Sequence, residues 1–203
     1  MKKWMSLFDL CPIRPSGQKE RAARITAMSY LRDCQDKEQR MEKQLLNTGE
    51  YILLRGKDSY NGLLQRVETN PVSRIAGQAI VDLYNSVPKS YRKNAVFLMN
   101  TVTLNELSRS LGVDRTMLSG QGDGTFMLID KPIVLCNAMP FISKGSVPIL
   151  FGDFGKVSIE DCGRDELQQE PCEGNPGTQQ CALTGYMECM LEDQLAVRGI
   201  RIV

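Results

Sequence analysis

Apolar residues repeat at helical spacing in the first quarter of the chain. Residues 18–47 contain neither Gly nor Pro, and their apolar positions are separated alternately by four and three residues, with Glu38 interrupting the stripe. These positions are Ala27, Leu31, Cys34, Met41 and Leu45. We predict one continuous amphipathic helix over residues 20–45, packed along one edge of a sheet that includes residues 148–161. A coiled coil is the alternative, although only about three imperfect heptads support it.

The pattern then changes to shorter elements. Asn47 to Gly49 are expected to end the first helix, and the segment EYILLRG that follows is expected to be a short strand or turn. Residues 70–87 predict a second helix with Ser73 as its N-cap. Its apolar face consists of Ile75, Ala79, Ile80, Leu83, Tyr84 and Val87. Residues 94–100 are short and almost continuously apolar, which favours a buried strand.

A third helix and a Gly-rich turn are expected next. Residues 103–112 predict a short helix with a capping box between Thr103 and Glu106, and Gly112 is placed to stop it. The segment SGQGDGTF, residues 119–126, invites comparison with a phosphate-binding loop. No lysine follows its glycines and the flanking residues are strand-like, so a flexible hairpin turn is the better interpretation.

The second half of the chain predicts strands. KPIVLCNAMP (131–140), VPILFGDF (147–154) and KVSIEDC (156–162) are three strand candidates separated by turn residues. Residues 163–180 are polar and contain Pro and Gly, which favours a mobile loop. The tail, residues 181–203, fits helix or strand, and its β-branched ending favours strands. This order predicts an α+β fold with helices segregated from a largely antiparallel sheet.

Composition excludes several kinds of chemistry. The chain of 203 residues has 42% apolar residues and no histidine, so it is a globular chain without Ser-His-Asp or Cys-His catalysis and without Cys/His zinc fingers. Its net charge of +1 argues against a strongly basic nucleic-acid binder. No catalytic, cofactor-binding or metal-binding residue is predicted, and no cofactor. The sequence alone therefore indicates a protein that is not an enzyme.

Charge and cysteine are unevenly distributed. Residues 1–60 carry 12 Lys/Arg against 8 Asp/Glu, whereas residues 151–203 carry 4 against 10. This asymmetry suits contact between copies of the chain, and two solvated faces explain it equally well. The seven cysteines include no CxxC pair, which predicts reduced thiols in a cytosolic protein. The first 15 residues do not form a signal peptide, and no segment has the ~20 apolar residues of a membrane span.

One tripeptide, Asp153-Phe154-Gly155, occurs in protein kinases as a magnesium-binding motif. A kinase also needs a catalytic His-Arg-Asp loop and a strand lysine, and this chain has no histidine and no matching strand. The kinase interpretation therefore fails, and the tripeptide is expected to form a turn.

Several segments, in order, resemble the major capsid protein family of tailed bacteriophages, whose shell fold is shared with encapsulins. The segments are AVFLMNTVTLNEL (95–107), DKPIVLCNAMP (130–140), ILFGDFGKVSIEDCGR (149–164) and MLEDQLAVRGIRIV (190–203). The resemblance covers the chain from about residue 18 to its end. It implies that Asp153-Phe154-Gly155 is a turn between two strands in which Gly155 relieves backbone strain.

The resemblance implies an α+β shell fold with two subdomains. A peripheral subdomain would contain residues 1–64, with the long spine helix, and the returning strands of residues 156–203, with a mobile loop at 163–180. An axial subdomain with a mixed, largely antiparallel sheet would contain residues 65–155. The family carries an N-terminal arm and a long hairpin before the spine helix, so the chain is expected to be the C-terminal portion of a capsid protein. On that basis we expect the isolated chain to be a monomer or a small ring-like oligomer.

The function implied by the resemblance is that of a structural subunit of an icosahedral phage or prophage head that encloses DNA. Its partners would be copies of itself in pentamers and hexamers, packaged DNA bound non-specifically, and a portal, scaffold or head protease. Its location would be the virion after synthesis in the bacterial cytoplasm. The alternatives are an encapsulin-like cargo shell and a small cytosolic enzyme.

Some family members cross-link their shells through a lysine–asparagine isopeptide bond beside a buried glutamate. Comparison of the closing strands places Glu192 at the glutamate position, but Gly185 stands at the asparagine position. We therefore expect no covalent cross-link and a structural role for Glu192 on a strand. Covalent ladders that survive reducing agent on a denaturing gel would contradict this expectation.

Overall fold

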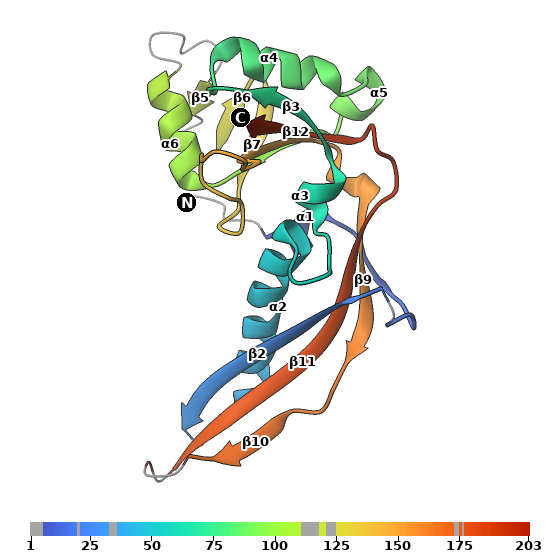
Figure 1. The fold of residues 1–203 in the computed structure, drawn as a ribbon, viewed down its shortest axis with the longest axis vertical. Coiled ribbons are helices and arrows are strands. Elements are labelled where there is room, and N and C mark those ends of the chain that lie inside the picture. The colour runs from blue at the N-terminus through green and yellow to red at the C-terminus, as the bar shows by residue number, and fades with distance from the viewer. Residues whose placement is uncertain are drawn as a thin grey trace.

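The chain folds into two lobes in the computed structural model, a compact lobe and a long lobe that extends away from it (Figure 1). The structure describes residues 6–19, 21–32, 36–110, 118–120, 125–172, 175 and 177–203. In chain order the elements are α1 (Leu7–Leu10), β1 (Ile13–Pro15), β2 (Ala23–Arg32), α2 (Lys37–Arg55), α3 (Leu63–Arg66), β3 (Glu68–Val72), α4 (Gly77–Ser86), α5 (Lys89–Arg92), β4 (Val96–Met99), α6 (Thr101–Ser110), β5 (Leu118–Gly120), β6 (Phe126–Leu128), β7 (Lys131–Leu135), β8 (Ile149–Gly152), a short 3-10 helix η1 (Phe154–Lys156), β9 (Val157–Arg164), β10 (Gln168–Pro171), β11 (Thr178–Leu191) and β12 (Val197–Ile202).

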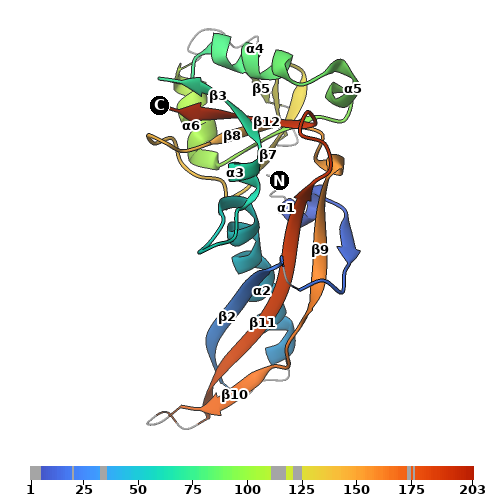
Figure 2. The same ribbon diagram turned by 45° about the vertical axis from the view of Figure 1, so that its right-hand side comes forward.

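The long lobe is a twisted sheet with one helix along it. Its strands lie in the order β1-β9-β11-β10, and β2 pairs with β11 on the other side. The pairing of β2 with β11 is antiparallel and runs from Thr178 opposite Arg32 to Met187 opposite Ala23. The helix α2 covers one face of these two strands, and β10 lies at the end farthest from the compact lobe, as Figure 2 shows.

Two glycines allow α2 to lie close to the sheet. A Cβ atom on Gly185 of β11 would lie 2.8 Å from Cδ2 of Leu45, and one on Gly49 of α2 would lie 3.2 Å from Cδ1 of Ile25. Side chains at these positions would therefore push the helix off the sheet. This close approach also explains why α2 continues through Gly49, since the packing outweighs the low helix propensity of glycine.

The compact lobe is built on a sheet in the order β3-β12-β8-β4-β7-β6-β5, in which β3 and β12 are parallel, as are β4 and β7, and the other pairs are antiparallel. Side chains on one face, such as Phe97 and Phe151, pack in a core with α4 and α6. Side chains on the other face, such as Leu98 and Leu150, join the core of the long lobe. The central strands are thus buried on both faces, which is why their sequences are continuously apolar.

The predicted α+β class and mixed sheet are confirmed, and so are several elements. The expected strand at 94–100 is β4, the three candidates of the second half are β7, β8 and β9, and the tail forms β11 and β12. The helix face predicted within residues 70–87 is also correct, since its apolar members are buried or packed against the core of the compact lobe. At 119–126, β5 and β6 pair antiparallel as the two sides of a hairpin, while residues 121–124 lie outside the described part of the chain.

The prediction of one helix over residues 20–45 is wrong. Residues 23–32 form β2, and the helix begins only at Lys37. In β2, Ala23, Ile25 and Ala27 are buried while the residues between them are exposed, which is the alternation of a strand. Pairing with β11, more than 140 residues away in the sequence, selects the strand. The first six residues of EYILLRG are the last part of α2, which ends at Arg55, with Gly56 as its C-cap, rather than near Gly49.

Two predicted helix starts are also wrong. Residues 68–72 are the edge strand β3, so the second helix begins at Gly77 after Ala76, and Ser73 is not its N-cap. The third helix begins at Thr101, where the side-chain oxygen of Asn100 accepts the N–H of Val102 at 2.8 Å, instead of at a Thr103/Glu106 capping box. The predicted stop at Gly112 lies outside the described residues.

The second half differs from the predictions in three places. The spine helix was expected along a sheet containing 148–161, but β8 belongs to the compact lobe and β9 to the long lobe. The loop prediction for 163–180 is wrong for 163–164, 168–171 and 178–180, which are strand residues of β9, β10 and β11. Pairing of polar strands at the end of the long lobe stabilises this hairpin, although its sequence has the composition of a loop.

The turn at Asp153-Phe154-Gly155 lies between β8 and β9, as expected. The carboxylate of Asp153 accepts the N–H of Gly155 at 3.0 Å and caps η1. Gly155 does not have a positive φ, so the strain expected there is absent. The glycine that the turn requires is Gly152, because a Cβ atom there would lie 2.1 Å from the carbonyl oxygen of Ala196.

Candidate assembly surfaces

The end of α2 joins the two lobes through backbone carbonyl groups. Arg55 donates to the carbonyl oxygens of Ala138 at 2.6 Å and Met139 at 3.0 Å, and the Tyr51 hydroxyl donates to that of Asn137 at 3.2 Å. The buried amide of Asn100 lies 3.4 Å from the carbonyl oxygens of residues 137 and 139. Residues 137–139 are therefore held by both lobes, through two charge-assisted hydrogen bonds from Arg55 and neutral ones from Tyr51 and Asn100.

This joint gives a physical meaning to two of the sequence motifs. The Met-Asn at the end of β4 supplies Asn100, which both caps α6 and donates to the segment Asn137–Met139. The Asn-Ala-Met-Pro segment supplies the carbonyl groups that Arg55 binds. The joint therefore connects the C-terminal end of α2 directly to the compact lobe.

A second hydrogen-bonded contact between the lobes lies just before the strand β12. The Tyr91 hydroxyl, at the end of α5, donates to the carboxylate of Asp193 in the turn between β11 and β12. This hydrogen bond, with a further one from the N–H of Leu195, lowers the pKa of Asp193. Asp193 is therefore held ionised at neutral pH, and the turn keeps its geometry.

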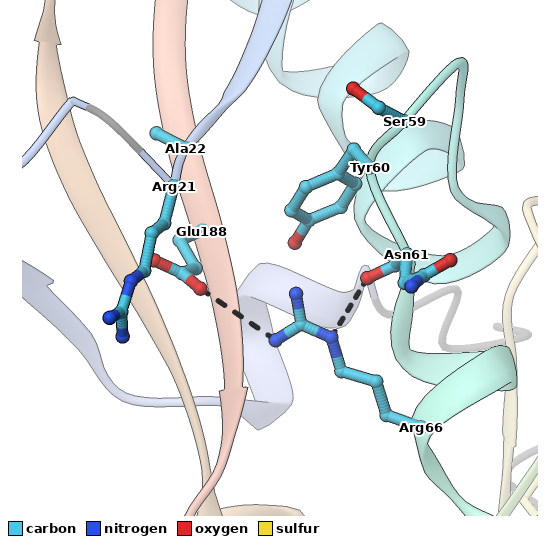
Figure 3. A pocket seen from close by; sticks show the side chains of 7 residues that line it. All are labelled: Arg21, Ala22, Ser59, Tyr60, Asn61, Arg66 and Glu188. Carbon is cyan, nitrogen blue, oxygen red and sulfur yellow. Dashed lines mark hydrogen bonds and ion pairs between the residues drawn. The ribbon is translucent and has the colours of Figure 1, made fainter.

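An open cleft of about 390 Å³ lies where β2 and β11 meet the turn before α3 (Figure 3). Arg66 lies at its centre. Its guanidinium donates to the carbonyl oxygens of Asn61, at 2.8 Å, and Cys189, and it lies 3.8 Å from the Glu188 carboxylate. Its guanidinium carbon is also 5.3 Å from the centre of the Tyr60 ring. Arg66 is therefore fixed in place by its neighbours.

The cleft presents more hydrogen-bond donors than acceptors. The Tyr60 oxygen accepts the N–H of Cys189 at 2.9 Å, which leaves its hydroxyl proton free, and burial raises the pKa of Tyr60 so that it remains protonated. Figure 3 shows this hydroxyl and one guanidinium nitrogen of Arg66 facing the same space. Arg21, on the opposite wall, is exposed and makes no ion pair or side-chain hydrogen bond with the described residues. Two arginines against one glutamate give the cleft a positive charge.

A contrasting surface lies at the far end of the long lobe. Cross-strand register places Tyr30, Gln180 and Glu170 in one row on the sheet face opposite α2, with Met28 one pair further along β2. Tyr30 is 70% exposed and Met28 55%. Glu170 is exposed and makes no ion pair within the described part of the chain. We call Met28, Tyr30 and Glu170 the tip face.

No catalytic arrangement forms among the described residues. They contain no group of three or more side chains that could bind a metal ion. Glu192 lies one residue beyond β11 rather than on it, and it pairs with Arg14 at 2.8 Å. The six described cysteines are all free thiols, and burial raises the pKa of Cys136 and Cys189 to about 12. The seventh, Cys34, lies outside the described residues.

Sequence reasoning named no residue of the cleft or tip face, and it quoted the motifs that contain the joint residues without giving those residues a role. Their partners are distant in sequence, as with Arg66 and Cys189 or Tyr30 and Glu170, so no local pattern marks them. The one available signal was the excess of basic residues in the first 60 positions and of acidic residues in the last 53, since Arg21 comes from the first region and Glu170 from the second.

The two lobes, joined by hydrogen bonds of Arg55 and Tyr91, carry open surfaces in the described regions of the chain. Within those regions, no helix has the length and apolar character needed to cross a membrane. The sequence profile of the phage capsid family matches residues 38–172. The chain belongs to this family and is a structural, non-enzymatic subunit of a phage capsid, assembling with copies of itself into the shell of a virion.

Solved structures share the fold at low sequence identity. The capsid of an empty GTA particle has a TM-score of 0.68 and 16% identity, covering 100% of this chain and 91% of that one. The capsid of a native GTA particle has a TM-score of 0.63 and 18% identity, covering 90% and 73%. An encapsulin complex from Synechococcus elongatus has a TM-score of 0.60 and 13% identity, covering 89% and 73%. A search of curated protein sequences finds no match.

Proposed function

We propose that this subunit encloses the DNA of a phage or prophage head, with residues 1–64 and 156–203 as the peripheral subdomain and residues 65–155 as the axial subdomain. The observation that supports this most strongly is the family match over residues 38–172, which extends from the spine helix through β10 and covers every strand of the compact lobe except β12. The two sheets support this division except at β12 (Val197–Ile202), which lies in the sheet of the compact lobe between β3 and β8.

Contact with DNA is proposed to be non-specific and confined to the inner face of the shell. A net charge of +1 gives no strong, sequence-reading basic surface, so each subunit would contribute few phosphate contacts. Binding summed over many subunits would then suffice to line the packaged DNA. A portal, a scaffold and a head protease are the further partners proposed, and synthesis in the bacterial cytoplasm precedes assembly.

The experiment is co-expression of a tagged chain with the head genes next to it in the genome, followed by density-gradient centrifugation. We expect the chain in a particle fraction that protects DNA from nuclease, with fragments of no preferred sequence. Particles that contain protein cargo and no nucleic acid would instead favour the encapsulin-like alternative, whose fold is shared. A chain that never enters a particle fraction would contradict both.

A further inference from the structure

We infer that the tip face of one copy docks in the Arg66 cleft of a second copy. The inference rests on the assembly of this chain with itself and names the surfaces that meet. Both are open in the single chain, since Tyr30 is 70% exposed and the cleft opens between β2 and the turn before α3.

The chemistry of the two surfaces is complementary. The cleft offers donors from Arg21, Arg66 and the Tyr60 hydroxyl, which together suit a carboxylate. The tip face offers the carboxylate of Glu170, which makes no ion pair within the described part of the chain, so a second copy supplies the group that the cleft lacks. Glu188 lies 3.8 Å from Arg66 and neutralises part of its charge, but Arg21 has no ion-pair partner among the described residues.

Exposed apolar groups accompany the charge. Tyr30 and Met28 lie on the same sheet face as Glu170, with Gln180 between Tyr30 and Glu170, and both residue types are enriched at protein interfaces. In the docked pair they would pack against the wall formed by Tyr60 and the turn around it. A charge flanked by apolar contacts is partly shielded from water and salt, which strengthens the ion pair.

The position of the two surfaces suits contact between neighbours. The tip lies at the far end of the long lobe, and the cleft lies near the junction of the lobes, so one chain cannot bring its own tip to its own cleft (Figures 1 and 2). Because tip and cleft are different surfaces, the contact joins copies head to tail, an arrangement that closes a ring when the rotation between copies permits.

The test uses a photo-cross-linker at the tip. Tyr30→benzoylphenylalanine is incorporated in one copy, and a second, isotopically labelled copy identifies cross-links between chains by mass spectrometry. We expect cross-links to residues 57–66 of the other copy. Phe141→benzoylphenylalanine, at a 55% exposed position of the compact lobe, is the matched control and should not reach that segment.

Charge variants test the contact itself. Arg21→Glu removes the unpaired cation, and Glu170→Arg removes the carboxylate, and neither side chain has a folding role in the described structure. Each variant alone should lower the cross-link yield at least about tenfold, as expected for a charge reversal in a close ion pair. A mixture of the two should restore the yield, because the intact tip of the Arg21→Glu copy meets the intact cleft of the Glu170→Arg copy.

Cross-links from position 30 that map only elsewhere, or that persist undiminished in Arg21→Glu, would overturn the inference and leave the capsid role unaffected. Absence of any cross-link between chains, from position 141 as well as position 30, would overturn the inference and also count against self-assembly. The two failures are therefore distinguishable.

Discussion

Replacing Gly185 by alanine tests the close packing of α2 on β11. The new Cβ atom would lie 2.8 Å from Cδ2 and 3.6 Å from Cδ1 of Leu45, which is fully buried. Carbon atoms in van der Waals contact are ~3.5–4.0 Å apart, so Leu45 or the helix must move by roughly 0.7 Å or more. Overpacking of this kind costs about 1–3 kcal/mol of unfolding free energy.

A double-mutant cycle separates this clash from other effects. Leu45→Ala alone should cost about 2–5 kcal/mol, because it leaves a cavity in the core. In the double variant, the methyl group of alanine at position 185 partly fills that cavity instead of clashing. The loss of unfolding free energy in the double variant should therefore be smaller than the sum of the two single-variant losses, by about 1 kcal/mol or more.

The measurement is urea unfolding followed by far-UV circular dichroism, at a concentration too low for association between chains. Gly17→Ala is the matched control, because nothing lies within 4 Å of the Cβ position and the change in unfolded-chain entropy is the same. It should change the unfolding free energy by less than about 1 kcal/mol and should not destabilise. Wild-type stability of Gly185→Ala, or strict additivity in the cycle, would refute the packing argument.

Three further predictions concern the joint and the buried ionisable groups. Arg55→Ala should destabilise the chain by about 2–3 kcal/mol, since it leaves two carbonyl groups without their donor. Lys57→Ala, at an exposed position, should change the unfolding free energy by no more than about 0.5 kcal/mol in the same assay. Equal effects of the two changes would contradict the stabilising role of Arg55 at the joint. Burial raises the pKa of Glu50, so protonated Glu50 stabilises the fold at acid pH and this stabilisation is lost as pH rises. The stability of Glu50→Gln relative to wild type should therefore increase from about pH 4 to about pH 7. A difference in stability that does not change with pH would contradict this sign. Among the described cysteines, half-buried Cys172 should react first with a thiol reagent at about pH 8. Burial raises the pKa of Cys136 to about 12, so Cys136 should react only when the chain unfolds. Mass spectrometry of the labelled peptides measures both rates, and equal rates would argue against the burial of Cys136.

The sequence alone determined the elements whose environment is uniform. The strands β4 and β8 are apolar at every position because both faces of their sheet are buried, so no knowledge of the partner was needed to identify them. The helix α4 has a single buried face, and its apolar spacing was sufficient to predict which side chains enter the core. Family-like motifs in the correct order then identified the fold, although their physical roles were not visible.

Tertiary structure alone decided the segments whose pattern fits more than one element. Residues 23–32 fit a helix or a strand by spacing, and the strand forms because β11 offers it a ten-residue ladder from a distant part of the chain. Gly49 would favour the end of an isolated helix, but α2 continues through it to Arg55 because its packing against Ile25 on the sheet stabilises the helix there. The cleft also depends on tertiary structure, because Arg66 and Cys189, which are 123 residues apart in the sequence, meet only in the folded chain.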